Sequence, residues 1–214
     1  MGSRHCGGLR GLLAAAVCLL ALSGCGTGEQ PGAASPEEQA KVIYTGFLEG
    51  NGVQLDEEQV AMWWIPNFQG SELRYEYTLL DLSGDGVPKL LVQLAEDPGG
   101  YNGVFHAEDG KLYCWNSDAA EMTCLDYPLD DGTMVRDYTF GGTRSYTIFR
   151  YTAAGETEEL ASFFAREERI PEDSPEPCPY YRVGETEVTR AEFETALQEQ
   201  IGDHLLDRSA WNAI

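Results

Sequence analysis

The stretch Leu73 to Leu94, LRYEYTLLDLSGDGVPKLLVQL, decides the fold of this chain. Its first part alternates apolar and polar residues with a period of two, which is typical of a β-strand with one buried face. Its last part, Leu90 to Leu94, is a second short apolar run. The glycine- and aspartate-rich segment between the two runs has the composition of a turn. The stretch therefore predicts two strands joined by a loop.

Turn signals recur downstream of this unit. They lie at residues 108–110, 130–132, 141–142 and 154–155, and short β-rich runs such as 112–115 and 146–151 separate them. This spacing predicts an antiparallel meander of six to nine strands.

Helix signals flank the strand region on both sides. Ser35 and Glu38 can form a capping box for a helix that begins at Pro36, and Thr189 and Glu192 can form another near the C-terminus. A shorter helix is expected from Asp56 to Trp64. We therefore expect an α+β fold, an antiparallel β-meander with an N-terminal and a C-terminal helix packed on it. The expected boundaries are one α+β domain over residues 36–201 and a C-terminal tail over residues 202–214.

The N-terminus has the three parts of a secretion signal. Arg4, His5 and Arg10 form a basic start, and residues 11–22 form an apolar run too short to span a bilayer permanently. The run leads into Leu22-Ser23-Gly24-Cys25, which resembles the lipobox of bacterial lipoproteins. The resemblance implies cleavage between Gly24 and Cys25 and attachment of acyl chains such as palmitate to Cys25. Residues 1–24 are then the signal peptide, and residues 25–35 a lipidated, flexible tether at the outer face of the bacterial cell membrane.

The loop within the opening stretch resembles calcium-binding loops that begin D-x-[DNS]-x-D-G. Its candidate ligands are the side chains of Asp81, Ser83 and Asp85 and the carbonyl oxygen of Val87. The motif is degenerate because Lys89 occupies the ninth position, where strand-flanked versions usually carry a carboxylate. Two interpretations stay open: weak calcium binding, or a structural turn in which the ammonium group of Lys89 replaces the ion.

A second resemblance covers about residues 36–200. The order of an N-terminal helix, an aromatic strand leading into D-x-x-G-D-G-x-P, a meander and a closing motif is similar to a group of uncharacterised surface lipoproteins of Gram-positive anaerobes. The resemblance implies location and fold style and brings no activity. The closing motif consists here of Tyr180, Tyr181, Gly184, Val188, Thr189, Glu192 and Phe193.

Charge and cysteine usage limit the classes of partner and cofactor. The chain has 36 acidic and 14 basic residues, a formal net charge of −22, which disfavours binding to nucleic acid. Cys114 and Cys124 could form a disulfide across a hairpin or remain as buried thiols, and Cys178 is expected to be free. Calcium is the one cofactor that the sequence suggests.

Signatures of catalysis are missing from the sequence. It contains no G-x-S-x-G motif or phosphate-binding loop, and His106 is expected to have a structural role. The leading hypothesis is a membrane-anchored, non-enzymatic binding module of the cell envelope with an unknown ligand or protein partner. The alternatives are a surface hydrolase of glycans or peptides that uses carboxylates, and a weakly calcium-responsive domain. Aromatic side chains could line a sugar- or peptide-binding face or belong to the core; they include Trp63, Trp64, Trp115 and Trp211.

Overall fold

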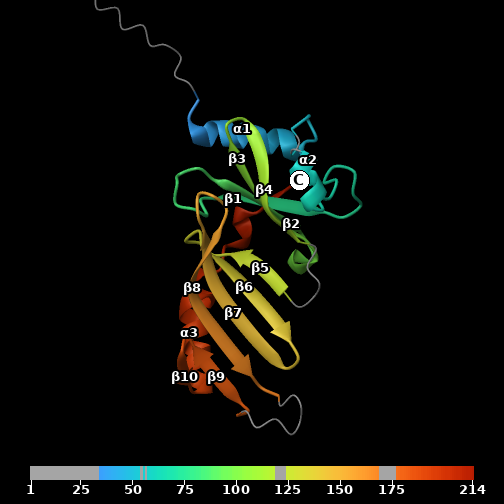
Figure 1. Cartoon of the computed structure of the whole chain (residues 1–214). Coiled ribbons are helices and arrows are strands. Elements are labelled where there is room, and N and C mark those ends of the chain that lie inside the picture. Colours follow the sequence, from blue (N-terminus) through green and yellow to red (C-terminus); the bar gives the residue numbers. More distant parts are fainter. Residues whose placement is uncertain (1–33, 54, 56, 119–123, 169–176) are drawn as a thin grey trace, which may run out of the picture. The chain divides into compact units, whose positions relative to one another are not determined.

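The computed structural model describes residues 34–53, 55, 57–118, 124–168 and 177–214 (Figure 1). These residues form two antiparallel sheets and three α-helices, so the α+β class is confirmed. Sheet A has the strand order β11-β1-β2-β3-β4. Its strands are β1 (Tyr75–Leu80), β2 (Lys89–Leu94), β3 (Asn102–Glu108), β4 (Lys111–Asp118) and β11 (Asn212–Ala213).

Sheet B has the strand order β10-β9-β8-β7-β6-β5, so each strand pairs with its neighbours in the sequence. Glycines with positive φ stand in the expected turns, at Gly110 in sheet A and at Gly132, Gly141 and Gly155 in sheet B. The strands of sheet B are β5 (Cys124–Pro128), β6 (Met134–Phe140), β7 (Thr143–Tyr151), β8 (Thr157–Arg166), β9 (Tyr180–Val183) and β10 (Thr186–Val188).

The expected single meander of six to nine strands is wrong, because the described residues form eleven strands divided between two sheets. Leu73 lies outside β1 and is exposed, although its place in the alternating pattern predicted a buried strand position. Residues 202–214 do not form a separate tail. They contain two 3₁₀ turns (Gly202–His204 and Arg208–Ala210) and β11, which pairs with β1 at the edge of sheet A.

Helix α1 (Pro36–Leu48) begins at the expected capping box, in which Ser35 and Glu38 accept each other's backbone N–H groups. Its residue Tyr44 accepts a hydrogen bond from the N–H of Ala107 at 3.0 Å and donates one to the carbonyl of Pro88 at 2.8 Å. The helix is thereby tied to β3 and to the end of the loop before β2. Helix α2 (Glu57–Met62) ends two residues before the expected Trp64.

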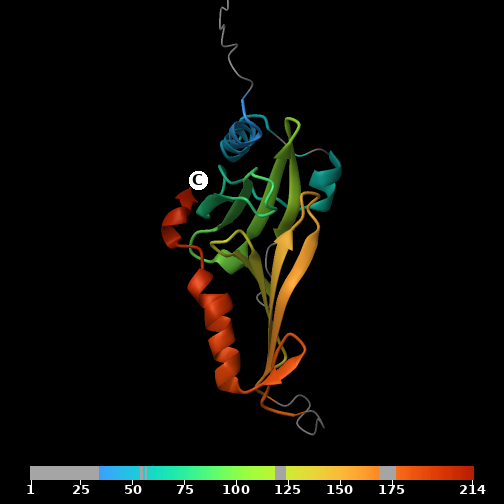
Figure 2. The same cartoon turned by 90° about the vertical axis from the view of Figure 1, so that its left-hand side faces the viewer.

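Helix α3 (Arg190–Gln200) begins at the second expected capping box, formed by Thr189 and Glu192. Its Phe193 contacts Phe163 and Tyr181 of sheet B, with ring centroids 6.3 and 5.4 Å apart. Figure 2 shows α3 along one face of this sheet.

Sheet A is buried on both faces. Leu90, Val92 and Phe105 pack with α1 residues in one apolar cluster. The intervening residues Leu91 and Val104 point the other way and pack against side chains of sheet B. We call this second contact the junction; its apolar part contains Leu82, Leu91, Val104, Met134, Phe149 and Tyr151.

Polar side chains surround the apolar part of the junction on sheet A. The buried residues Lys89, Gln93, Asn102 and His106 occupy strand positions that face sheet B by alternation. Gln93 donates to Glu76 at 2.7 Å, and Asn102 donates to the carbonyl of Asp126 in β5 at 2.9 Å. The Asn102 bond therefore connects the two sheets, whereas the Gln93 bond links two strands within sheet A.

Candidate functional site

The loop of residues 81–88 is closed by hydrogen bonds from its own backbone to Asp81. One carboxylate oxygen of Asp81 accepts from the N–H of Gly84 at 2.8 Å and of Ser83 at 3.3 Å. The other accepts from the N–H of Gly86 at 2.8 Å. Both oxygens of Asp81 therefore stabilise the turn, which is a common role for aspartate in tight loops.

The ammonium group of Lys89 lies within the loop and has no exposed surface. Its Nζ atom donates to the two carboxylate oxygens of Asp85 at 2.9 and 3.1 Å and to the carbonyl of Val87 at 2.6 Å. Burial alone would raise the pKa of Asp85, but the hydrogen bonds from Lys89 and the N–H of Val87 hold this pKa below its ordinary value of 3.8. Two of the predicted calcium ligands, Asp85 and Val87, thus accept hydrogen bonds from Lys89.

These contacts are those expected of the structural-turn alternative. The structure brings Asp81, Ser83, Asp85 and Val87 into one loop, as the motif predicts, and adds Lys89 to it. Within the part of the chain that the structure describes, no three acidic, histidine or cysteine side chains are grouped as metal ligands. Calcium binding stays a prediction.

An aromatic stack covers Lys89 on the side of sheet A that faces the junction. Nζ of Lys89 lies 5.3 Å from the ring centroid of Trp115, which stacks on His106 at 4.8 Å and lies 5.2 Å from Tyr151 of sheet B. Burial and the nearby charge of Lys89 lower the pKa of His106 below its ordinary value of 6.5. A polar cavity of about 440 Å³ adjoins the stack and is lined in part by Glu108. His106 is buried within this stack, and its structural role stays a prediction.

Cys114 and Cys124 are both free thiols in the structure. They lie in β4 and β5, which belong to different sheets, so the hairpin that would place them face to face is absent from the described residues. Cys114 is buried and Cys124 is half-buried, and Cys178 is also free. The structure therefore agrees with free thiols at Cys114 and Cys124 and not with a disulfide between them.

The predicted lipidation site lies outside the described residues. Gly24 and Cys25, and the tether up to residue 33, are not part of the structural description. Among the described helices, none is long and apolar enough to cross a membrane.

The small cavity at the edge of the junction contains acidic residues, which bears on the hydrolase alternative. It measures about 220 Å³ and is lined by Asp118 and Asp126, among others. Asp126 is buried, and Arg136 donates to its two oxygens at 2.9 and 2.7 Å. Hydrogen bonds from Arg136 therefore occupy both oxygens of Asp126. The geometry does not favour the hydrolase.

The tryptophans do not gather into one binding face. Trp63 packs against the cluster beneath α1, whereas Trp115 and Trp211 pack against the junction. Trp64 is exposed and contacts Tyr101 edge to face at 5.9 Å. The core interpretation therefore holds for three of the four tryptophans.

Sheet B has one face that is covered over only part of its length. Its residues Met134, Phe149 and Tyr151 belong to the junction with sheet A. Farther along the same strands, Figure 2 shows no helix on this side, while α3 lies on the opposite side. We call the uncovered part the arginine–aromatic face. Its residues are Arg136, Tyr138 and Phe140 of β6, Phe164 and Arg166 of β8, and Tyr180 and Arg182 of β9.

The strand register brings these side chains together. Phe140, Thr143, Arg166 and Tyr180 are successive cross-strand partners in one row. Directly opposite residues on neighbouring strands point to the same face, so each row forms a continuous strip. The adjacent row consists of Tyr138, Ser145, Phe164 and Arg182.

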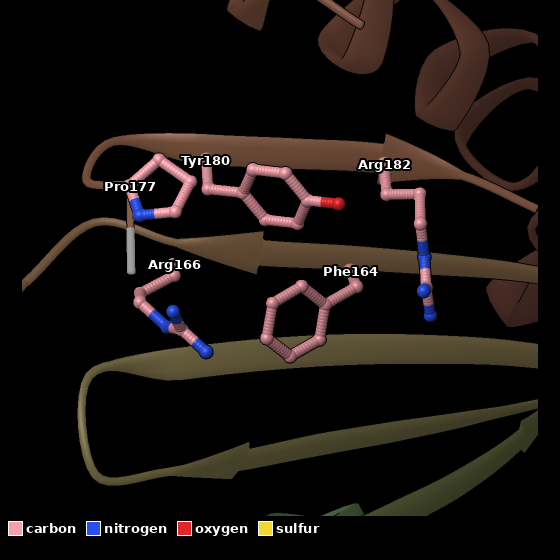
Figure 3. Close-up of a pocket in the computed structure, with 5 residues that line it drawn as sticks. All are labelled: Phe164, Arg166, Pro177, Tyr180 and Arg182. Atoms are coloured by element: carbon pink, nitrogen blue, oxygen red, sulfur yellow. The ribbon is translucent and has the colours of Figure 1, made fainter. Parts of the chain in front are cut away.

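The exposure of this face is unusual for aromatic residues. Phe140 is 65% exposed and Tyr138 is 41% exposed, and their rings stack at 6.4 Å. A contiguous apolar and aromatic patch on a protein surface marks an interaction site more often than isolated exposed residues do. Between β8 and β9 the face is hollowed into a pocket, in which Phe164, Arg166, Tyr180 and Arg182 surround a common space (Figure 3).

Sequence reasoning missed this face, although a signal for it exists. Phe164 and Arg166, Tyr180 and Arg182, and Arg136 and Tyr138 are each separated by one residue. In a strand this spacing places an aromatic ring and a guanidinium on the same side. In a chain with only 14 basic residues, the repetition of that pattern in three strands was informative.

A scan against protein-family models found no match, and searches of the curated proteins and of the solved structures found no similar protein.

Proposed function

We propose that this protein is an extracytoplasmic lipoprotein that acts as a non-enzymatic binding module of the bacterial cell envelope. In this proposal Cys25 carries the lipid that anchors the chain to the outer face of the cell membrane. The basic start, the short apolar run and the Leu22–Cys25 box support the anchor. The resemblance to surface lipoproteins supports the same location.

The observation that carries the binding role is the arginine–aromatic face. It combines exposed rings with guanidinium groups on a face of sheet B that no described helix covers. Aromatic and arginine side chains are the residues most enriched at recognition surfaces, because both combine a large contact area with polar groups. The two helices complete the scaffold in this proposal, with α1 packed on sheet A and α3 packed on sheet B.

Nucleic acid is not the proposed partner. The net charge of −22 creates a repulsive field toward a dense phosphate backbone, and three arginines on one face do not offset it. The ligand is instead expected among envelope components that are uncharged or carry a lower density of negative charge than nucleic acid.

Membrane attachment can be tested on the native protein. Mass spectrometry of its N-terminal peptide is expected to show a chain that begins at a lipid-modified Cys25. A Cys25→Ala variant is expected to keep its leader or to appear in the soluble fraction. An unmodified Cys25 in a chain that retains residues 1–24 inside the cell would contradict the proposed location.

The binding role can be tested on glycan and peptide arrays with the purified mature protein. The Tyr138→Ser/Phe140→Ser variant is expected to lose the signals that the wild-type protein gives. The matched control is Val42→Ser/Val60→Ser, which removes two exposed apolar side chains from helices α1 and α2. If the double variant, its control and an Arg182→Gln variant all bind like the wild type, the arginine–aromatic face is not the binding surface.

A further inference from the structure

The pocket of the arginine–aromatic face has the size of a small-ligand site. Its volume is about 450 Å³, and sites for small ligands measure roughly 300–1,000 Å³. Phe164 and Arg166 come from β8, Tyr180 and Arg182 come from β9, and Pro177 closes one end (Figure 3). Strands hold four of the five lining residues, so the pocket is built on a rigid scaffold.

The two guanidinium groups are arranged around one ring. The Cζ atoms of Arg166 and Arg182 lie 5.7 and 6.0 Å from the centroid of Phe164. Tyr180 is the second ring, 6.2 Å from Phe164 at an interplanar angle of 60°. In Figure 3 the two arginines lie on opposite sides of Phe164. A ligand in the pocket therefore meets ring surface at its centre and positive charge at both ends.

Two of these side chains have polar groups without partners in the described structure. Arg182 forms no ion pair with any described residue, although the exposed Glu187 is its cross-strand partner in β10. The hydroxyl group of Tyr180 forms no hydrogen bond with the described residues either. The pocket thus offers a guanidinium fork and a phenol that remain available to a ligand.

These groups match a sugar that bears a carboxylate. A guanidinium group binds a carboxylate through two parallel hydrogen bonds, which adds geometric specificity to the charge attraction. The C–H-bearing face of a pyranose ring is apolar and can pack on the half-buried rings of Phe164 and Tyr180, while the Tyr180 hydroxyl can exchange hydrogen bonds with sugar hydroxyls. A ring with one carboxylate uses the aromatic and the cationic groups together.

Two other classes of ligand, phosphate polymers and peptides, fit this pocket less well. Polymers with dense phosphate charge are repelled by the chain's charge of −22. A peptide usually gains affinity by pairing with a sheet edge, but the described edge strand next to the pocket, β10, has only three residues. The open face of the sheet is better suited to stacked rings than to an extended peptide.

We propose that the pocket lined by Phe164, Arg166, Tyr180 and Arg182 binds carboxylate-bearing sugar residues of an acidic glycan. This inference rests on the proposed function as a binding module and adds the class of ligand to it. Arg182 binds a carboxylate, and Phe164 and Tyr180 pack against the sugar rings.

The test is calorimetric titration of the full mature protein with tri-galacturonic acid, its methyl ester and tri-glutamate at physiological salt. Tri-galacturonic acid is expected to bind with a dissociation constant of about 1 mM or lower, and the neutral ester at least about tenfold more weakly. The peptide has the same number of side-chain carboxylates but no sugar rings, and is expected to bind as weakly as the ester.

Arginine variants locate the binding. Arg182→Gln is expected to weaken binding of tri-galacturonic acid about tenfold, and Arg182→Lys is expected to weaken it less, because the charge remains while the fork is lost. The matched control is Arg150→Gln, which removes one exposed positive charge from β7 outside the pocket. Circular dichroism and the unfolding midpoint show whether each variant is folded.

The outcomes separate this inference from the function on which it rests. Equal binding of acid and ester would overturn carboxylate recognition but leave a sugar-binding module, and binding of tri-glutamate as tight as that of the sugar would show an acidic-peptide site. No binding of tri-galacturonic acid up to about 10 mM would overturn the inference even if the arrays identify another ligand. Failure of the proposed function itself would appear as array signals that depend neither on Tyr138 and Phe140 nor on Arg182.

Discussion

The Nζ atom of Lys89 lies 2.9 Å from one carboxylate oxygen of Asp85 and 3.1 Å from the other, inside a loop whose sequence resembles a calcium site. The same nitrogen donates to the carbonyl of Val87 at 2.6 Å. Calcium ligands in such loops are carboxylate and carbonyl oxygens, and here both kinds face an ammonium group. The positive charge that pairs with Asp85 therefore comes from Lys89 of the protein itself.

Replacement of Lys89 by methionine is expected to lower the free energy of unfolding by about 2 kcal/mol, because it leaves Asp85 without its buried partner. This loss is smaller than the roughly 3–5 kcal/mol typical of a fully buried ion pair that loses one partner, because the Asp85 side chain is 27% exposed. Lys41→Met is the control, since Lys41 forms an ion pair with Glu37 that is about half exposed, worth less than about 0.5 kcal/mol. Urea denaturation measures both, and equal losses would refute a special role for Lys89.

Calcium is expected to leave the melting temperature of the wild-type protein unchanged up to millimolar concentration, because Lys89 occupies the loop. Lys89→Asp supplies a carboxylate at the ninth loop position and is expected to make the melting temperature rise with calcium. Differential scanning fluorimetry with calcium and with magnesium measures the response. A calcium-dependent rise in the wild type would restore the metal-site interpretation.

The pH dependence of stability is expected to reflect His106. The pKa of the folded His106 is below its ordinary value of 6.5, chiefly through burial and then through the charge of Lys89. Below pH 6.5 the unfolded chain therefore binds more protons at this site than the folded chain, so stability falls as the pH falls from 6.5 toward the folded pKa.

The variant His106→Phe keeps an aromatic ring against Trp115 and removes the titration. It is expected to lose less stability than the wild type between pH 7 and pH 5.5, by up to about 1 kcal/mol. Urea midpoints at the two pH values give the comparison. An identical pH dependence in both proteins would show that the pKa of His106 is not lowered.

Thiol labelling is expected to follow burial. Burial raises the pKa of Cys114 to about 12, and its Sγ donates to the carbonyl of Asn116, so little reactive thiolate exists at pH 8. Iodoacetamide is expected to label Cys124 and Cys178 in the native protein and Cys114 only after unfolding. Peptide mapping identifies the labelled sites. Detection of a peptide that joins Cys114 to Cys124 in protein prepared without reductant would show the disulfide instead.

The parts of the fold that depend on local signals were predictable. The capping boxes at Ser35 and Thr189 mark the starts of α1 and α3, and the glycine turns mark the ends of strands, because each signal satisfies backbone groups within a few residues. The division into two sheets depends instead on contacts between distant segments. Leu91 and Val104 are buried by residues about 30 to 60 positions later, and no short window contains that information.

One sequence feature did contain a trace of the two-sheet arrangement. Five of the six residues of β2 are buried, including Lys89, and its apolar residues run consecutively from Leu90 to Val92. Such a run is typical of a strand covered on both faces, whereas a one-sided meander predicts alternation. The candidate site was harder to find, because the rows of the arginine–aromatic face exist only once β6, β7, β8 and β9 are in register.

The pairing of Asn212 and Ala213 with β1 has a consequence for how sheet A folds. Ile214 donates its N–H to the carbonyl of Tyr75, so sheet A acquires its outermost strand only when this distant segment folds back onto β1. Until then the free edge of β1 has unpaired backbone groups, and the sheet is incomplete.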